Sequence, residues 1–160
     1  CARFAVLAGN FLDAASAKAL GLLTHLVEPS AVESTVSAIS SQGKPGEKYP
    51  CAPADPEHSV VSFATSFYSD NNIVSLLSGR IPEGYDTEDK MVSRQFKSLS
   101  RTAPVALSMA SDLLNTTTHS DLNSGLESEL RGLNTIFSTE DALEGLSALI
   151  EGRRPEYSGA

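Results

Sequence analysis

Acidic side chains in the last quarter of the chain are the groups best placed for acid and base chemistry. Glu127 and Glu129 lie two residues apart, so on a helix they do not face each other as a catalytic pair would. Glu140, Asp141 and Glu144 fall at the start of a second expected helix, where the positive end of the helix dipole stabilises carboxylates. We therefore predict solvated and helix-capping roles for these groups, and we assign no catalytic residue among them.

Basic side chains offer a different chemistry, the binding of phosphate groups. Arg153 and Arg154 follow the last expected helix, and two interpretations fit them. They form a solvated helix end, or they contact the phosphates of a ligand, which a guanidinium grips with two hydrogen bonds. Lys97 and Arg101 are weaker candidates for the same role. His25 lies in an otherwise apolar segment, and we interpret it as a hydrogen-bonded core histidine rather than a base.

The composition excludes several classes of function. The 160 residues carry 20 acidic side chains against 12 Lys and Arg, and the net charge of −8 argues against a broad nucleic-acid surface or a polybasic membrane patch. No apolar run approaches the roughly 18 residues of a transmembrane helix, so we expect a cytoplasmic protein with no membrane or nucleic-acid partner. Cys1, Cys51 and the histidines lack metal-ligand spacing, which predicts two reduced cysteines and no metal site.

Two amphipathic helices must position the charged groups near the carboxyl end. In the first, apolar residues at steps of four, four, three and four share one face, which must be buried: Leu122, Leu126, Leu130, Leu133 and Phe137. The second is capped by Ser138 and stopped by Gly152, and its apolar residues are Leu143, Leu146, Leu149 and Ile150. Such a pair needs a sheet, a neighbouring subunit or both to cover its apolar stripes.

The whole chain divides into three regions, at residues 1–42, 43–59 and 60–157. In the first we expect a short helix capped by Asp13, a buried strand or extended segment over 22–27, and a helix opened by a capping box at 30–33. The second region is a Pro/Gly-rich loop or insertion. The third shows only helical periodicity. A helix that starts near residue 60 is expected to carry Val60, Ala64, Phe67 and Tyr68 on one inward face. A later helix, from 87–89 to about 100, is expected to point Lys90, Arg94 and Lys97 outward.

Two stretches, near the start and the end of the chain, carry a family pattern. The first runs from Leu7 to Val27, with matching positions at Leu7, Gly9, Ala14, Ala17, Gly21, Leu22 and Val27. The second is Phe137–Gly145, followed by Glu151 and Arg153. It resembles the Phe-x-Ser/Thr-x-Asp-x-x-Glu-Gly helix, ending in Glu-x-Arg, of the crotonase superfamily, and the first stretch resembles a turn, helix and strand of the same enoyl-CoA hydratases and isomerases.

The resemblance implies a fold and an activity. It implies a mainly α chain, the helical carboxyl-terminal portion of a crotonase-type ββα-spiral fold that lacks most of the spiral core. The implied parent is an enoyl-CoA hydratase, which hydrates 2-enoyl-CoA to 3-hydroxyacyl-CoA in fatty-acid metabolism. One candidate parent is a multifunctional 3-hydroxyacyl-CoA dehydrogenase/enoyl-CoA hydratase. The backbone amides that stabilise the thioester enolate and the acid or base would precede residue 1, so this fragment is expected to be inactive alone.

The resemblance also implies binding roles for the helical tail. In the family this tail builds a trimer interface and lines the entrance for CoA, so we expect an acyl-CoA substrate, no covalently bound cofactor and a homo-oligomer. Arg153 and Arg154 are then candidates for the CoA phosphates. Leu133 and Phe137 fall near the position where family members pack an aromatic side chain against adenine, although core packing also fits both.

Two alternatives stay open. The first is another acyl-CoA isomerase, hydrolase or decarboxylase of the same superfamily, because the residues that decide the reaction lie upstream. The second is a non-catalytic helical module whose apolar stripes serve only self-association. Binding of CoA distinguishes the second alternative from the enzymes.

Overall fold

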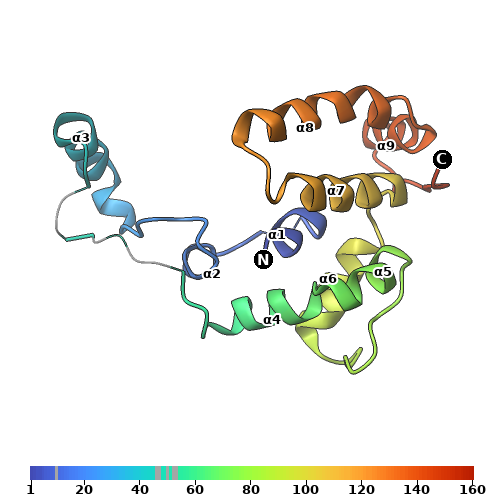
Figure 1. The fold of residues 1–160 in the computed structure, drawn as a ribbon, viewed down its shortest axis with the longest axis horizontal. Helices are drawn as coiled ribbons and strands as arrows, with labels where there is room; N and C mark the ends of the chain where they lie inside the picture. Colours follow the sequence, from blue (N-terminus) through green and yellow to red (C-terminus); the bar gives the residue numbers. More distant parts are fainter. Residues whose placement is uncertain (10, 46–47, 50, 52–53) are drawn as a thin grey trace. The chain divides into compact units, whose positions relative to one another are not determined.

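The computed structural model describes residues 1–9, 11–45, 48–49, 51 and 54–160 (Figure 1). Every regular element in these ranges is a helix, which confirms the mainly α prediction. The chain forms two compact units, one made of Cys1 and residues 11–66, the other of residues 2–10 and 67–160. Of the Pro/Gly-rich region predicted at 43–59, residues 46–47, 50 and 52–53 lie outside the described residues.

The first unit holds short helices joined by long connections. They are α2 (Ala14–Ala19), the 3-10 helix η1 (Pro29–Ala31), α3 (Val32–Gln42) and most of α4 (Ser59–Phe67). The Asp13 side chain accepts a hydrogen bond from the Ser16 amide at 2.7 Å, which confirms the predicted cap of α2. The Asp55 amide donates to the Ala19 carbonyl at 3.0 Å and ties the later connection to the end of α2.

Two predictions in this unit need correction. Of the buried strand or extended segment predicted over 22–27, the strand does not form, because no second strand among the described residues offers a hydrogen-bonding partner. The segment has no regular secondary structure, and Leu22 is 57% exposed. The capping box at 30–33 does not form either: Pro29, whose fixed φ suits the first turn of a helix, starts η1. Ala31 then precedes α3 without a side-chain cap.

The second unit contains α1 (Ala2–Leu7), α5 (Asp70–Leu77), α6 (Lys90–Leu99), α7 (Pro104–Thr117), α8 (Leu122–Phe137) and α9 (Glu140–Glu151). Its core includes Phe67, which is fully buried and meets the rings of Tyr68 and Tyr85 edge-on at 5.3 and 4.9 Å. The Tyr68 hydroxyl donates to Gln95 at 3.0 Å, and burial raises the pKa of this phenol. Of the residues predicted to point inward, Phe67 and Tyr68 belong to this unit and Val60 and Ala64 to the first, and all four are buried.

One arginine links helix α1 to its neighbours in this unit. The Arg3 guanidinium donates to the Tyr68 carbonyl at 3.1 Å and to Asn115 at 2.8 Å, and it pairs with Asp70 at 2.7 Å. These contacts join α1 to the start of α5 and to α7. The sequence left residues 2–8 open between a helix end and a strand, and the structure shows the helix.

Helices α7, α8 and α9 follow one another at the carboxyl end, with α8 packed along α7 (Figure 1). Helix α8 turns its glycines toward α7: a Cβ on Gly132 would meet the Met109 methyl at 3.8 Å, and one on Gly125 would meet Thr117 at 4.0 Å. The predicted apolar face is between 46% and 77% exposed in the single chain, so the cover that we expect from a sheet or a neighbouring subunit stays a prediction: Leu122, Leu126, Leu130, Leu133 and Phe137. Small residues let the two helices approach closely, which leaves the leucines outside.

The junction of α8 and α9 also corrects a predicted cap. Ser138 ends α8 as its carboxyl-terminal cap, and Thr139 caps α9 by accepting a hydrogen bond from the Ala142 amide at 3.1 Å. The cap thus lies one residue later than the sequence indicated. Gly152 ends α9 with a φ of 67°, as predicted, since a left-handed residue suits glycine at that position.

Candidate functional site

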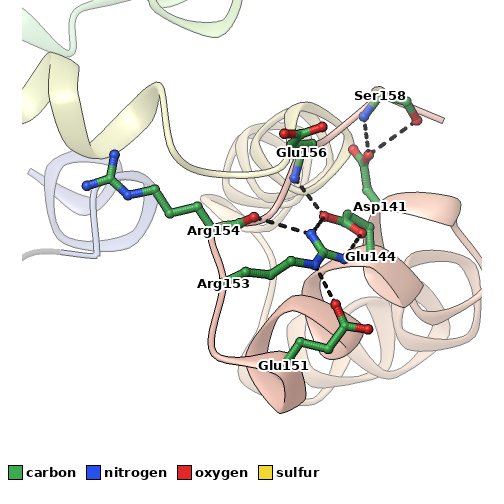
Figure 2. A network of polar contacts seen from close by, with 7 residues as sticks. All are labelled: Asp141, Glu144, Glu151, Arg153, Arg154, Glu156 and Ser158. Carbon is green, nitrogen blue, oxygen red and sulfur yellow. Dashed lines mark hydrogen bonds and ion pairs between the residues drawn. The ribbon is translucent and has the colours of Figure 1, made fainter.

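A network of charged groups joins α9 to the tail that follows it (Figure 2). The Arg153 guanidinium donates to both oxygens of Glu144, at 2.5 and 2.8 Å, and to Glu151 at 2.6 Å. The Glu144 carboxylate also accepts the Glu156 amide at 2.7 Å. Its hydrogen bonds to Arg153 and Glu156 lower the pKa of Glu144 to about 2. Arg153 is therefore surrounded by carboxylates and fixes the direction in which the tail leaves α9.

Asp141 holds the end of the same tail (Figure 2). This carboxylate is 2% exposed and accepts hydrogen bonds from the amides of Ser158 and Gly159, at 2.8 and 3.1 Å. The Asp141 amide in turn donates to the Ala160 carbonyl at 3.1 Å. A residue predicted to serve the helix dipole thus folds the last residues back onto α9.

The folded tail creates a hollow of about 380 Å³ against the connection between α6 and α7, which we call the arginine hollow. It is lined by Ser100, Arg101, Thr102, Pro104, Arg154, Pro155 and Tyr157. Arg154 points away from the carboxylates that surround Arg153 (Figure 2). No carboxylate lines this hollow, and neither of its arginines forms an ion pair with the residues that the structure describes. Two guanidinium groups beside proline and tyrosine walls suit an anion attached to a flat or apolar body.

A model of the enoyl-CoA hydratase/isomerase family matches residues 1–160. The chain belongs to the enoyl-CoA hydratase/isomerase family. This match confirms the resemblance to the crotonase superfamily that the two stretches near the start and the end of the chain indicated. No solved structure matches the chain.

Among the residues predicted to bind the family's CoA ligand, the structure brings some together and separates others. Arg154 and Arg101 share the arginine hollow although 53 positions part them in the sequence. Leu133 lines a different, mostly apolar groove of about 450 Å³ between α7 and α8. Phe137 is 68% exposed at the end of α8. Neither lines the arginine hollow.

Lys97 is the other weak candidate for a phosphate contact. It lies on the exposed side of α6 beside Lys90 and Arg94, which the sequence predicted only to face outward. Arg94 and Lys97 line a hollow of about 520 Å³ with Arg101, and Lys90 lines the next one. The steps of four and three place Lys90, Arg94 and Lys97 on one face of α6, and Arg101 follows four residues later in the turn after the helix. That spacing is the signal that identifies the four together.

The remaining candidates have local roles. His25 is only half-buried, and its Nδ1 lies 2.9 Å from the Thr24 hydroxyl, so the hydrogen bond exists but the core position is wrong. Glu127 pairs across one turn with Arg131 at 3.7 Å, as expected of a solvated face. Cys1 and Cys51 are free and exposed.

Within the described ranges, no cluster of His, Cys, Asp and Glu has the arrangement of a metal site. None of the helices in the described part of the chain combines the length and apolar character that a bilayer span requires.

Proposed function

We propose that the chain is the helical carboxyl-terminal part of an enoyl-CoA hydratase and supplies part of the rim that binds CoA. In this reaction water adds across the double bond of a 2-enoyl-CoA and gives a 3-hydroxyacyl-CoA. The step requires donors for the thioester oxygen and a positioned acid or base. We place those groups in sequence that precedes residue 1. The near alternative is an isomerase, hydrolase or decarboxylase of the same superfamily.

The observation that carries the proposal is the pairing of Arg101 and Arg154 in the arginine hollow. The nucleotide of CoA combines phosphate groups with a flat adenine ring. Two guanidinium groups suit the phosphates, and Tyr157 with the neighbouring prolines offers an apolar wall for the ring. Family membership supports the choice of this ligand class, and the lining of the hollow supports the choice of this site for it.

Arg153 and Arg154 have different roles in this proposal. Because Arg153 donates to Glu144 and Glu151, its guanidinium is already neutralised. We propose that it positions the tail, so that Arg154 reaches the ligand. Contacts of Leu133 and Phe137 with adenine stay a prediction, and they suit a CoA molecule bound by a neighbouring subunit, since both side chains are largely exposed.

The exposed leucines of α8 support a homo-oligomer, which we propose to be based on a trimer in the parent protein. Helix α9 adds a second exposed apolar set, Leu143, Leu146, Leu149 and Ile150. Contiguous apolar surface of this kind marks an interaction site. The same surface also fits the non-catalytic alternative, a helical module that only associates with itself.

Calorimetric titration of the 160-residue chain with crotonyl-CoA tests the proposal. We expect saturable binding that Arg154→Ala and Arg101→Ala each weaken, and that Arg131→Ala leaves unchanged, because Arg131 pairs with Glu127 on α8, outside the hollow. Absorbance of the conjugated thioester should stay constant, since the chain is expected to lack the groups that add water. Absence of saturable binding would favour the self-association module. If Arg101→Ala and Arg154→Ala both leave the affinity unchanged, neither arginine belongs to the CoA-binding rim.

A further inference from the structure

One face of α6 and the turn after it carries an exposed row of cations, Lys90, Arg94, Lys97 and Arg101, which we call the basic stripe. None of these four pairs with an acidic group among the residues that the structure describes. Like charges one helical turn apart repel each other, so an unpaired stripe destabilises its own helix. A bound anion would remove that repulsion.

Three hollows adjoin one another along the basic stripe. The hollow of about 520 Å³ shares Arg101 and Thr102 with the arginine hollow at one end. It shares Arg94 and Lys97 with a hollow of about 440 Å³ at the other end. Among the described residues that line these three hollows, one is acidic: Glu88, which lines only the hollow of about 440 Å³ at the far end.

The stripe concentrates positive charge in an acidic chain. With Arg154, it contains five of the chain's 12 Lys and Arg residues, although the net charge is −8. Arg94 and Lys97 lie within α6, whereas Arg101 lies in the turn after the helix end at Leu99 and also lines the arginine hollow, so the cations offer two phosphate positions rather than one. The surface therefore suits a small ligand with more than one phosphate group.

We propose that Arg94 and Lys97 bind the 3′-phosphate of CoA, beside a separate site for the pyrophosphate at Arg101 and Arg154. This inference rests on the proposed function and assigns the second anionic group of its ligand. The 3′-phosphate is a terminal monoester with a charge near −2, and two neighbouring cations in an open hollow match that charge. The pyrophosphate is internal and carries its charge on a linker, which suits the two guanidinium groups of the arginine hollow.

The geometry around the stripe fixes its position relative to α1. The Ser98 hydroxyl donates to the Ala8 carbonyl, between Lys97 and the buried Leu99. Asp89 caps α6 by accepting the amides of Met91 and Val92 at 2.7 and 3.1 Å. The cations thus project from a helix that is anchored at its first turn and near its end.

The test compares CoA with dephospho-CoA, which lacks only the 3′-phosphate. Titration of the unchanged chain should show tighter binding of CoA. The Arg94→Ala/Lys97→Ala variant should lose about ten- to a hundredfold in affinity for CoA, the range for a charged hydrogen-bonding group, and nearly none for dephospho-CoA. The Arg80→Ala/Arg131→Ala variant removes the same charge away from the hollows and should leave both affinities unchanged.

The other outcomes of these titrations separate a failure of the 3′-phosphate site from a failure of the proposed function. An unchanged affinity for CoA in the Arg94/Lys97 variant, or an equal loss for both ligands, would overturn the 3′-phosphate site and leave the proposed function standing. Failure of the unchanged chain to bind either ligand would overturn both. The Arg94→Gln/Lys97→Gln variant retains most of each aliphatic stem, and it replaces the alanine variant if circular dichroism shows lost helix.

Discussion

Arg153 donates two hydrogen bonds to Glu144, nine residues earlier on α9, in the bidentate geometry that guanidinium and carboxylate groups favour (Figure 2). The pair spans the left-handed Gly152, which reverses the chain after α9. The reversal brings Arg154 to the lining of the arginine hollow, where the residue stays exposed but forms no ion pair with the carboxylates around Arg153 among the described residues. Two adjacent arginines therefore have different surroundings, and one positions the other.

The first prediction concerns the pH dependence of this tail. The pKa of Glu144 is lowered from 4.5 to about 2, so the folded tail favours the ionised form. A lowered pKa contributes stability above the unfolded value, and that contribution is lost as the pH falls through the folded value. We expect tail docking to be complete above about pH 4.5 and to weaken from there toward pH 2. The measurement is the amide chemical shift of Glu156 across a pH titration.

Glu144→Gln is the matched variant for that titration, because it keeps the shape but cannot ionise. The pH-dependent step at Glu156 should disappear in this variant. A step of the same midpoint in both proteins would assign it to another group.

The second prediction concerns Asp141. Removing this buried acceptor by Asp141→Ala leaves the amides of Ser158 and Gly159 without their partner, and an unsatisfied buried donor costs about 1–3 kcal/mol. We expect urea denaturation to show a loss of this size in the free energy of unfolding. Glu140→Ala, at the exposed neighbouring position, is the control and should change stability by much less. Equal effects at both positions would show that Asp141 acts only through the helix dipole.

The third prediction compares two glycines within helices. Gly132→Ala should stabilise the chain by about 0.5–1 kcal/mol, because alanine is the better helix former and its Cβ would meet Met109 at an ordinary 3.8 Å. Gly145→Ala should gain less or lose stability, since its Cβ would approach the Tyr157 hydroxyl to 3.2 Å. Thermal denaturation ranks the two variants. A larger gain at Gly145 would contradict the packing of Tyr157 against α9.

Helix positions were largely predictable from the sequence because they depend on local chemistry. Asp13 caps α2 as expected, and the spacing of Val60, Ala64 and Phe67 places them inside. The predictions failed where the local structure depends on contacts with other parts of the chain. Leu22 was expected to be buried in a strand or an extended segment, but a strand forms only with a partner, and none lies within the described residues.

The candidate site was less predictable, because it depends on a chain reversal. Nothing local indicates that Asp141 accepts the amides of the last residues, or that Arg154 meets Arg101 from another helix. The sequence did identify both arginines by their chemistry. The sequence could not assign different roles to Arg153 and Arg154, because these adjacent residues differ only in the carboxylates that surround them in the structure.

The last prediction concerns the exposed face of α8. Leu126 and Leu130 are 52% and 67% exposed, so changing both to glutamate should leave the fold of a single chain intact. If another copy covers this face, burying two carboxylates there is unfavourable and the oligomer should dissociate. Light scattering after size exclusion should then give the 16.9 kDa of one chain for Leu126→Glu/Leu130→Glu, and a larger mass for the unchanged protein.

Val74→Glu is the control for this experiment, because Val74 is 69% exposed on α5, away from the face of α8. It should keep the larger mass. A mass of one chain for the unchanged protein would contradict self-association through α8. A larger mass that survives both glutamates would place the interface elsewhere, and the exposed apolar residues of α9 would be the next to change.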